Sequence, residues 1–501
     1  MGVMDIAIIG GTLVTMDAAR RLVPNGLVLV SQGVIRYVGP ADRCNSWAAT
    51  TVLRADRKLV LPGLIDAHGH AGHCMVRAMG DRPDLDWLKV AEEVYFRSTT
   101  EDSWFLEAQL AALERVKFGV TCGYSMIGSI PRCDDPRYAL GHVRGTNSVG
   151  LREVIGVGPG LPPWPKTVCC WTDGRRKTLQ CSMERTLEVT EQLLHMWRGG
   201  QLGSRVGIQV SPSRIGDPAV LGDEALRRQT EEVRRLADEY GVMVHSHAYS
   251  GAIDYAYRHL DVLGPRTVLA HCTGITEQEV RLLAQTGTHV AHCPSARAAV
   301  RGRCPAPELI DAGVNVALAT DGSGPDRTFC LLKEMRVAAI VHRAYLHSDA
   351  VLPPGKLLEM VTIDAARALG LSDVVGSLEV GKRADIIIVD VSQPHQVPFA
   401  MPVHRLVYTT SGQDVDSAII DGRVVMEGRR ILTVDEESVL SECQGEFEHI
   451  LTRSGLRWAL ETRPDMWTQS RYSSVSPVQA PNEAYCPTTS PEAKVGDESR
   501  G

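Results

Sequence analysis

The middle of the chain alternates between amphipathic segments and short apolar ones. Residues 101–118 and 224–240 have the charged, periodic pattern of helices, and each ends before a glycine, Gly119 or Gly241. An apolar run follows each glycine, for example Val242-Met-Val-His-Ser-His. Strands that are apolar throughout are typically covered on both faces. The pattern therefore predicts parallel strands that alternate with helices.

The same unit recurs further along the chain. Short helical segments over 277–285 and 307–312 precede Gly287 and Gly313, and an apolar run follows each glycine. Strands and helices that alternate in this way over about 300 residues fit a barrel or a doubly wound sheet. The fold class expected from the residues alone is therefore α/β.

Both ends of the chain carry short β-branched runs broken by turns, over residues 1–58 and about 376–435. Because domain termini often lie close together, we expect the two ends to form a single small β-domain. The expected organisation is a first part of this domain at 1–58, a barrel at 59–370, its second part at 371–435, a C-terminal helical extension at 436–469 and a disordered tail at 470–501. The tail is assigned to disorder because it is rich in Ser, Pro, Thr, Glu and Gly.

Composition narrows the class of protein. The chain has 501 residues and a net charge of −7, without a basic block, which argues against nucleic acid or an anionic membrane as a partner. There is no apolar run of the ~18–20 residues that a membrane span requires. Asp5 and the lack of a basic region make the N-terminus a poor secretory signal. The 13 cysteines form no CxxC pair, so we expect them to be reduced core residues of a cytoplasmic protein. The expected partner is a small-molecule substrate. Self-association is left open.

Polar residues end several of the predicted strands: His68, His70, His247, His271 and Asp321. Active sites of barrels lie at the carboxyl ends of the strands. Because alternate residues of a strand share a side, the two histidines of the HxH pair point the same way. A third imidazole and a carboxylate would complete an N3O set for one divalent ion, with Zn²⁺ as the first choice and Fe²⁺ or Mn²⁺ as alternatives. Taken singly, these residues have structural interpretations too, such as a hydrogen-bonded histidine pair or a turn at Asp321-Gly.

Five motifs, in this order along the chain, resemble the amidohydrolase superfamily: PGLIDAHGH, VHSHAYS, VLAHCTGITEQEV, THVAHCPSA and NVALATDGSG. More specifically, they resemble its cytosine deaminase-like branch, which includes adenosine-derivative deaminases, guanine deaminases and s-triazine hydrolases. The resemblance covers about residues 5–430 and implies a TIM-like (β/α)8 barrel with a small β-sandwich domain. It also assigns the metal to His68, His70, His247 and Asp321, and it places His271 against the substrate and the hydrolytic water.

Two details of the sequence qualify this resemblance. Binuclear members of the superfamily use a carbamylated lysine after the fourth strand, but the expected fourth strand, 206–212, contains no lysine, which favours a single ion. Members of this branch commonly carry a glutamate three residues after the fifth-strand histidine, where this chain has Ser250. Because a serine cannot act as a carboxylic acid, ordinary deamination of nucleobases is in doubt.

The expected function is therefore metal-dependent hydrolysis of a C–N bond in a cyclic or heteroaromatic small molecule, by a hydroxide generated at the metal. Asp321 is expected to act as the general base and His271 to polarise the bond or orient the water. Ser250 and His292, which ends the seventh strand, are candidate substrate contacts, whereas His245 is interpreted as a deeper core residue. The alternatives are displacement of chloride or an alkylamine from a triazine-like ring, and a non-catalytic descendant that only binds metal.

Overall fold

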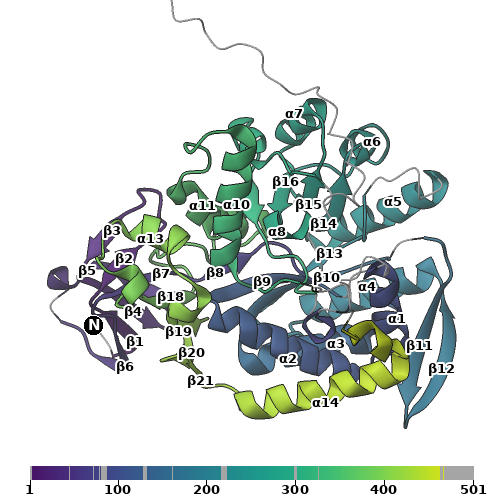
Figure 1. The fold of residues 1–501 in the computed structure, drawn as a ribbon, viewed down its shortest axis with the longest axis horizontal. Coiled ribbons are helices and arrows are strands. Elements are labelled where there is room, and N and C mark those ends of the chain that lie inside the picture. The colour runs from purple at the N-terminus through teal and green to yellow at the C-terminus, as the bar shows by residue number, and fades with distance from the viewer. Residues whose placement is uncertain are drawn as a thin grey trace, which may run out of the picture. The chain divides into compact units, whose positions relative to one another are not determined.

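The computed structural model describes residues 3–44, 46–70, 73–77, 79, 87–127, 132–160, 162–215, 223–297, 302–324, 326–462 and 467. Contacts group Met1–Leu460 into one compact unit and Glu461–Gly501 into a second. The predicted tail at 470–501 and part of the predicted helical extension lie outside the described residues. Figure 1 labels most helices and strands of the first unit.

Eight parallel strands form one sheet, in the order in which they occur along the chain. They are β8 (Leu64–Asp66), β9 (Val120–Met126), β10 (Arg152–Val157), β13 (Val206–Val210), β14 (Val244–Tyr249), β15 (Thr267–Thr273), β16 (His289–His292) and β17 (Val316–Leu318). Every residue of these strands is buried except Gly207 and Tyr249, which are half-buried. This burial explains why most residues of these strands are apolar, with polar exceptions such as Glu153 in β10 and His247 in β14.

Hydrogen bonds between the first and last of these strands close the sheet. The Asp321 N–H donates to the carbonyl of His68 at 3.0 Å. The Thr320 N–H donates to Oδ1 of Asp66 at 2.9 Å, and the Thr320 hydroxyl donates to Oδ2 at 2.6 Å. Buried Arg115 lies 3.5 Å from the same carboxylate. The predicted TIM-like barrel is confirmed, and its seam lies directly beside two of the candidate metal ligands.

Helices alternate with these strands along the chain (Figure 1). They are α1 (Trp87–Arg97), α2 (Glu101–Lys117), α3 (Pro136–Val149), α4 (Met183–Arg198), α5 (Asp223–Tyr240), α6 (Ala252–His259), α7 (Glu277–Thr286), α8 (Pro294–Arg297), α9 (Ala306–Asp311), α10 (Leu331–Leu346), α11 (Pro354–Met360) and α12 (Ile363–Ala368). Their limits follow local chemistry. The side chain of Thr276 caps α7 in a capping box with Glu279, and α7 ends before Gly287, whose φ of 71° favours glycine.

The two ends of the chain form two sheets packed face to face. One sheet has the order β5 (Val34–Pro40), β4 (Gly26–Ser31), β1 (Met4–Ile9), β6 (Ala49–Arg54), and the other β21 (Arg430–Ile431), β20 (Arg423–Glu427), β19 (Val415–Ile420), β18 (Ile386–Asp390), β7 (Lys58–Pro62), β2 (Thr12–Val14), β3 (Leu22–Pro24). Strands β7 and β18 pair antiparallel, although more than 300 residues separate them in the sequence. Ile8 and Val30 of the first sheet share one core with Val60 and Ile388 of the second. The predicted β-sandwich built from both ends is confirmed.

Three further elements extend these domains. A hairpin of β11 (Lys166–Thr172) and β12 (Arg175–Cys181) follows β10, and α13 (Pro402–Tyr408) lies between β18 and β19. Helix α14 (Glu436–Ser454) packs along α2 (Figure 1), where Lys117 pairs with Glu436 at 2.6 Å. Within the described ranges, every helix is too short or too polar to cross a bilayer. The cysteines in those ranges are free thiols, and all but Cys170 are buried.

Candidate metal centre

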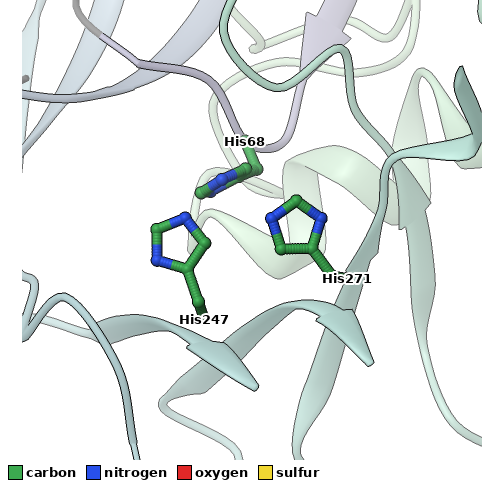
Figure 2. A group of neighbouring side chains, drawn as sticks. All are labelled: His68, His247 and His271. Carbon is green, nitrogen blue, oxygen red and sulfur yellow. The ribbon is translucent and has the colours of Figure 1, made fainter. Parts of the chain in front are cut away.

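The four predicted metal ligands lie at the carboxyl ends of three barrel strands. His68 and His70 follow β8, His247 is in β14, and Asp321 follows β17. His271, in β15, lies beside them. Figure 2 shows that the rings of His68, His247 and His271 point toward one another from different parts of the barrel.

Short distances join these side chains into one cluster. Nε2 of His70 lies 3.1 Å from Oδ1 of Asp321 and 3.3 Å from Nε2 of His247. The candidate ligand atoms of His68, His70 and Asp321 all lie within 4.8 Å of one another, and so do those of His68, His247 and His271. All five side chains are buried. The structure therefore brings together every residue that the resemblance assigned to the metal, together with His271.

The donor set of the cluster fits a divalent cation. Nε2 of His68 is buried and has no hydrogen-bond partner among the described residues, and Oδ1 of Asp321 is 3.8 Å away. An unpaired buried polar atom is costly, and a bound cation would remove that cost. Three imidazole nitrogens and one carboxylate oxygen are ligands that suit Zn²⁺.

Backbone contacts orient the ligand from β14. Nδ1 of His247 lies 2.5 Å from the carbonyl oxygen of Ser213, which can only accept a hydrogen bond. The proton of the neutral ring is therefore on Nδ1, and Nε2, which faces His70, is left with its lone pair. This is the arrangement in which proteins usually present a histidine to a metal.

The charge states in the cluster also suit a cation. Burial, followed by the neighbouring His247 and His245, lowers the pKa of His68 well below its usual value, so the ring is neutral at pH 7. Burial opposes ionisation of Asp321, but the hydrogen bond from His70 and the charges of His271 and Arg327 outweigh it and lower the pKa of Asp321 well below its usual value. A neutral imidazole and an ionised carboxylate are the forms that bind metal.

Comparison with known proteins identifies the family. The family model named "Amidohydrolase family" matches residues 59–425, which span the whole barrel and most of the second part of the sandwich. The chain belongs to the amidohydrolase family.

Individual relatives agree with this assignment. The chain is 31% identical over 443 residues to a 5-methylthioadenosine/S-adenosylhomocysteine deaminase of Syntrophobacter fumaroxidans. This alignment covers 87% of this chain and 96% of the relative. The fold of this chain is similar to that of an adenosine deaminase from Xanthomonas campestris with bound zinc, with a TM-score of 0.77 and 25% identity. The match covers 90% of this chain and 99% of the deaminase. The fold of an atrazine chlorohydrolase from Arthrobacter aurescens complexed with zinc is also similar, with a TM-score of 0.74, 22% identity and coverage of 88% and 100%. As predicted, the protein is a metal-dependent hydrolase of C–N bonds other than peptide bonds.

Strained backbone holds two site residues of this amidohydrolase. Asp321 and His271 have φ values of 63° and 72°, in the left-handed region that residues other than glycine rarely adopt. The N–H groups of Asp321 and Gly322 are both bonded, to the His68 carbonyl and to Oδ1 of Asp321. At His271, the pairing of β14 with β15 is interrupted by a register shift. These contacts keep the two side chains directed at the cluster.

The ring of His271 has two stacked aromatic neighbours. Its ring stacks on His247 with centroids 5.2 Å apart and on Tyr249 at 5.6 Å. The guanidinium of Arg214 lies over the Tyr249 ring at 5.2 Å. Stacking therefore holds His271 next to the proposed ligands.

The two predicted substrate contacts have different surroundings. Ser250 is exposed just after β14, and its N–H donates to the carbonyl of Thr273 at 3.2 Å. His292 is buried, and its Nε2 lies 2.9 Å from Nε2 of His342 in α10. Contact with a substrate stays a prediction for both residues.

Residues beyond the predicted ligands also support the cluster, and sequence reasoning missed the parts played by Gln209 and His245. His245, interpreted as a core residue, contacts His68 directly through a 2.9 Å hydrogen bond, and Gln209 contacts His245. His73 stacks on His70 with centroids 4.8 Å apart. A Cβ at Gly322 would lie 2.1 Å from Nδ1 of His73, so glycine is required at that position. The HxH spacing of His245 and His247 was the one signal in the sequence that could have drawn attention to His245.

Proposed function

We propose that this amidohydrolase holds a single zinc ion on His68, His70, His247 and Asp321 and hydrolyses a C–N bond at a carbon of a heteroaromatic ring. The observation that carries the proposal is the buried Nε2 of His68, which faces the Asp321 carboxylate and has no hydrogen-bond partner within the described ranges. A single ion is proposed because the described residues of β13 include no lysine that could bridge two ions. Fe²⁺ and Mn²⁺ are the alternatives to zinc.

When bound, the ion supplies hydroxide at neutral pH by lowering the pKa of water to ~7. Side chains of the protein transfer the protons. Oδ1 of Asp321 is engaged by His70 at 3.1 Å and by the Gly322 N–H at 2.8 Å. The Arg327 guanidinium lies 3.6 Å from Oδ2. The Asp321 carboxylate takes the proton of the attacking water and passes it to the leaving group. His271, stacked on His247 and Tyr249, orients the water or polarises the bond under attack.

The leaving group depends on Ser250. The relatives named as deaminases support an amine as the group displaced. An amine leaves a ring slowly unless a ring nitrogen is protonated, and Ser250 offers no carboxylic acid for that step. General acid catalysis typically supplies ~10²–10⁴-fold. We therefore expect slow ammonia release from ordinary nucleosides and faster turnover when the leaving group needs no proton. The second candidate function is displacement of chloride, which departs as an anion.

A substrate panel tests these proposals. Zinc-loaded protein is incubated with cytosine, guanine, 5′-deoxyadenosine, methylthioadenosine and chloro- and amino-triazines, and ammonia, chloride and product mass are read together. Ser250→Glu should raise ammonia release from the nucleosides by about 10²-fold, whereas Ser250→Gln, of the same size but without an acid, should not. Rapid wild-type turnover of methylthioadenosine would show that the inference from Ser250 is wrong.

Metal analysis tests the centre itself. Protein purified without chelator should contain about one equivalent of zinc per chain, as an N3O set without a bridging lysine implies. Two tightly bound equivalents would contradict the single-ion proposal. One equivalent with no turnover of any heterocycle would favour the non-catalytic alternative.

A further inference from the structure

A chain of hydrogen bonds leads from the cluster into the barrel and ends on a backbone carbonyl. Nδ1 of His68 lies 2.9 Å from Nε2 of His245. Nδ1 of His245 lies 3.2 Å from Oε1 of Gln209, whose Nε2 donates to the carbonyl of Leu369 at 3.4 Å. All four residues are buried. The chain joins β13, β14 and β8 to the end of α12.

The position of each proton in this series of hydrogen bonds follows from the Leu369 carbonyl at its inner end. The Leu369 carbonyl can only accept, so it takes the amide N–H of Gln209 and leaves Oε1 facing His245. Oε1 also only accepts, so the proton of His245 is on Nδ1 and its Nε2 has a lone pair. That lone pair requires the proton of His68 to be on Nδ1. The second nitrogen of His68 is then unprotonated. It is the atom that faces Asp321, and it has no hydrogen-bond partner in the part of the chain that the structure describes.

Packing holds the middle of the chain in place. The ring of Tyr124 stacks on His245 with centroids 3.8 Å apart and an angle of 11° between the planes. The Tyr124 hydroxyl is itself bonded to Ser211, on the loop that follows β13. The ring of His245 is also nearly parallel to that of His68, with centroids 5.1 Å apart. His245 therefore cannot turn away from either partner without unstacking two rings.

We propose that Gln209, acting through His245, fixes the proton of His68 on Nδ1 and thereby keeps Nε2 of His68 available to the metal. Both are positioning residues, since neither is one of the proposed metal ligands. Without Gln209, His245 could carry its proton on Nε2 and donate to His68. His68 would then carry its own proton on Nε2, where it would compete with the cation. The inference rests on the proposed metal centre.

Zinc affinity is the first readout. Gln209→Leu removes the acceptor of His245, and loss of such a partner typically weakens metal binding 10–100-fold. Zinc competition against a chelator should show a dissociation constant raised by about that factor. Gln396→Leu is the matched control, because Gln396 is equally buried and makes two side-chain hydrogen bonds, but lies in the segment between β18 and α13. Equal zinc affinities of the two variants would overturn the proposal.

A pair of variants at the next position tests whether the effect passes through His245. A glutamine there can donate to Gln209 and accept from His68, whereas a leucine can do neither. His245→Gln should therefore bind zinc more tightly than His245→Leu. In the His245→Leu background, Gln209→Leu should add no further loss, because the path is already broken. A full additional 10-fold loss would show that Gln209 acts by another route.

The proton position can be read directly, even if a leucine variant does not fold. Wild-type protein labelled with ¹⁵N in histidine alone is freed of metal, and the His68 signals are assigned by their loss in His68→Gln. Long-range ¹H–¹⁵N correlations should show a protonated Nδ1 and an unprotonated Nε2. A proton on Nε2 would overturn the proposal. Because this measurement needs no metal, it separates the failure of the inference from the failure of the proposed function, which would appear as a wild type that binds no zinc.

Discussion

Two pairs of buried histidines in this barrel are each joined by a 2.9 Å contact between ring nitrogens, yet they present different chemistry. In the first pair, Nδ1 of His68 meets Nε2 of His245, and the neutral amide of Gln209 lies behind it. In the second pair, Nε2 of His292 meets Nε2 of His342, and the guanidinium of Arg303 lies 3.2 Å behind it.

The group behind each pair decides where the lone pairs go. Oε1 of Gln209 accepts a hydrogen bond from Nδ1 of His245, so both rings carry their proton on Nδ1 and Nε2 of His68 keeps its lone pair. Arg303 can only donate, so Nδ1 of His342 accepts, its Nε2 carries the proton, and Nε2 of His292 must accept it. In the first pair, the lone pair on Nε2 of His68 faces the ligand cluster. In the second pair, the lone pair on Nε2 of His292 accepts the hydrogen bond from His342. Similar histidine contacts therefore suit a metal ligand in one place and a structural link in the other.

The largest expected contrast is between the outer histidines of the two pairs. His68→Ala should remove the metal and lower activity by more than about 10³-fold, because hydroxide at neutral pH depends on the ion. Asp321→Ala should do the same. His292→Ala should keep its metal. Elemental analysis and turnover on the best substrate of the panel check all three, with circular dichroism to confirm folding. Retained metal and near-normal turnover in His68→Ala and Asp321→Ala would refute the ligand assignment.

Much of this arrangement could be predicted from the sequence, for a physical reason. Strands covered on both faces are mostly apolar, so polar residues at their carboxyl ends are noticeable in the sequence, and these residues meet at one edge of the barrel. Period-two alternation then directs His68 and His70 to the same side. The β-sandwich followed from β-branched runs at both ends, since the termini of a domain tend to lie together.

The roles of the other histidines could not be predicted, because they depend on contacts between distant segments. His245 and His247 share a face of β14, and alternation alone cannot tell which of them reaches the cluster. The difference comes from Gln209 and Ser213, which face one ring each. Likewise His292 ends its strand as a rim residue should, but its partner His342 lies 50 residues later, on a helix. No periodicity in the sequence encodes such a pairing.

The next test concerns Arg303, the guanidinium next to His342 in the second histidine pair. Arg303→Met leaves the largely buried carboxylate of Glu308 without its partner and removes the donor to His342. Breaking such a pair should lower the free energy of unfolding by about 2–3 kcal/mol, somewhat less than for a fully buried pair. Zinc affinity should not change, because the second pair does not orient a ligand. Urea unfolding and zinc competition measure the two quantities.

Arg281→Met is the matched control for this variant. Arg281 pairs with Glu277 at 3.4 Å on the surface of α7, where both side chains are more than half exposed. Its loss should cost less than about 0.5 kcal/mol. If Arg303→Met weakened zinc binding, the distinction between the two histidine pairs would not hold.

The smallest effect concerns acid stability and depends on the ring next to Arg303. Burial, together with the charge of Arg303, lowers the pKa of His342 from 6.5 to about 4. As the pH falls below 6.5, the unfolded chain therefore binds a proton at this position that the folded protein does not, and folded stability is lost until the pH reaches about 4. Between pH 7 and pH 5 this one group should account for about 1–2 kcal/mol. His342→Gln, which cannot titrate, should lose that much less stability over the same interval, as measured by urea unfolding of metal-free protein at both pH values. Parallel losses in the wild type and the variant would mean that His342 is protonated in the folded protein at pH 5, and that Arg303 does not donate to its Nδ1.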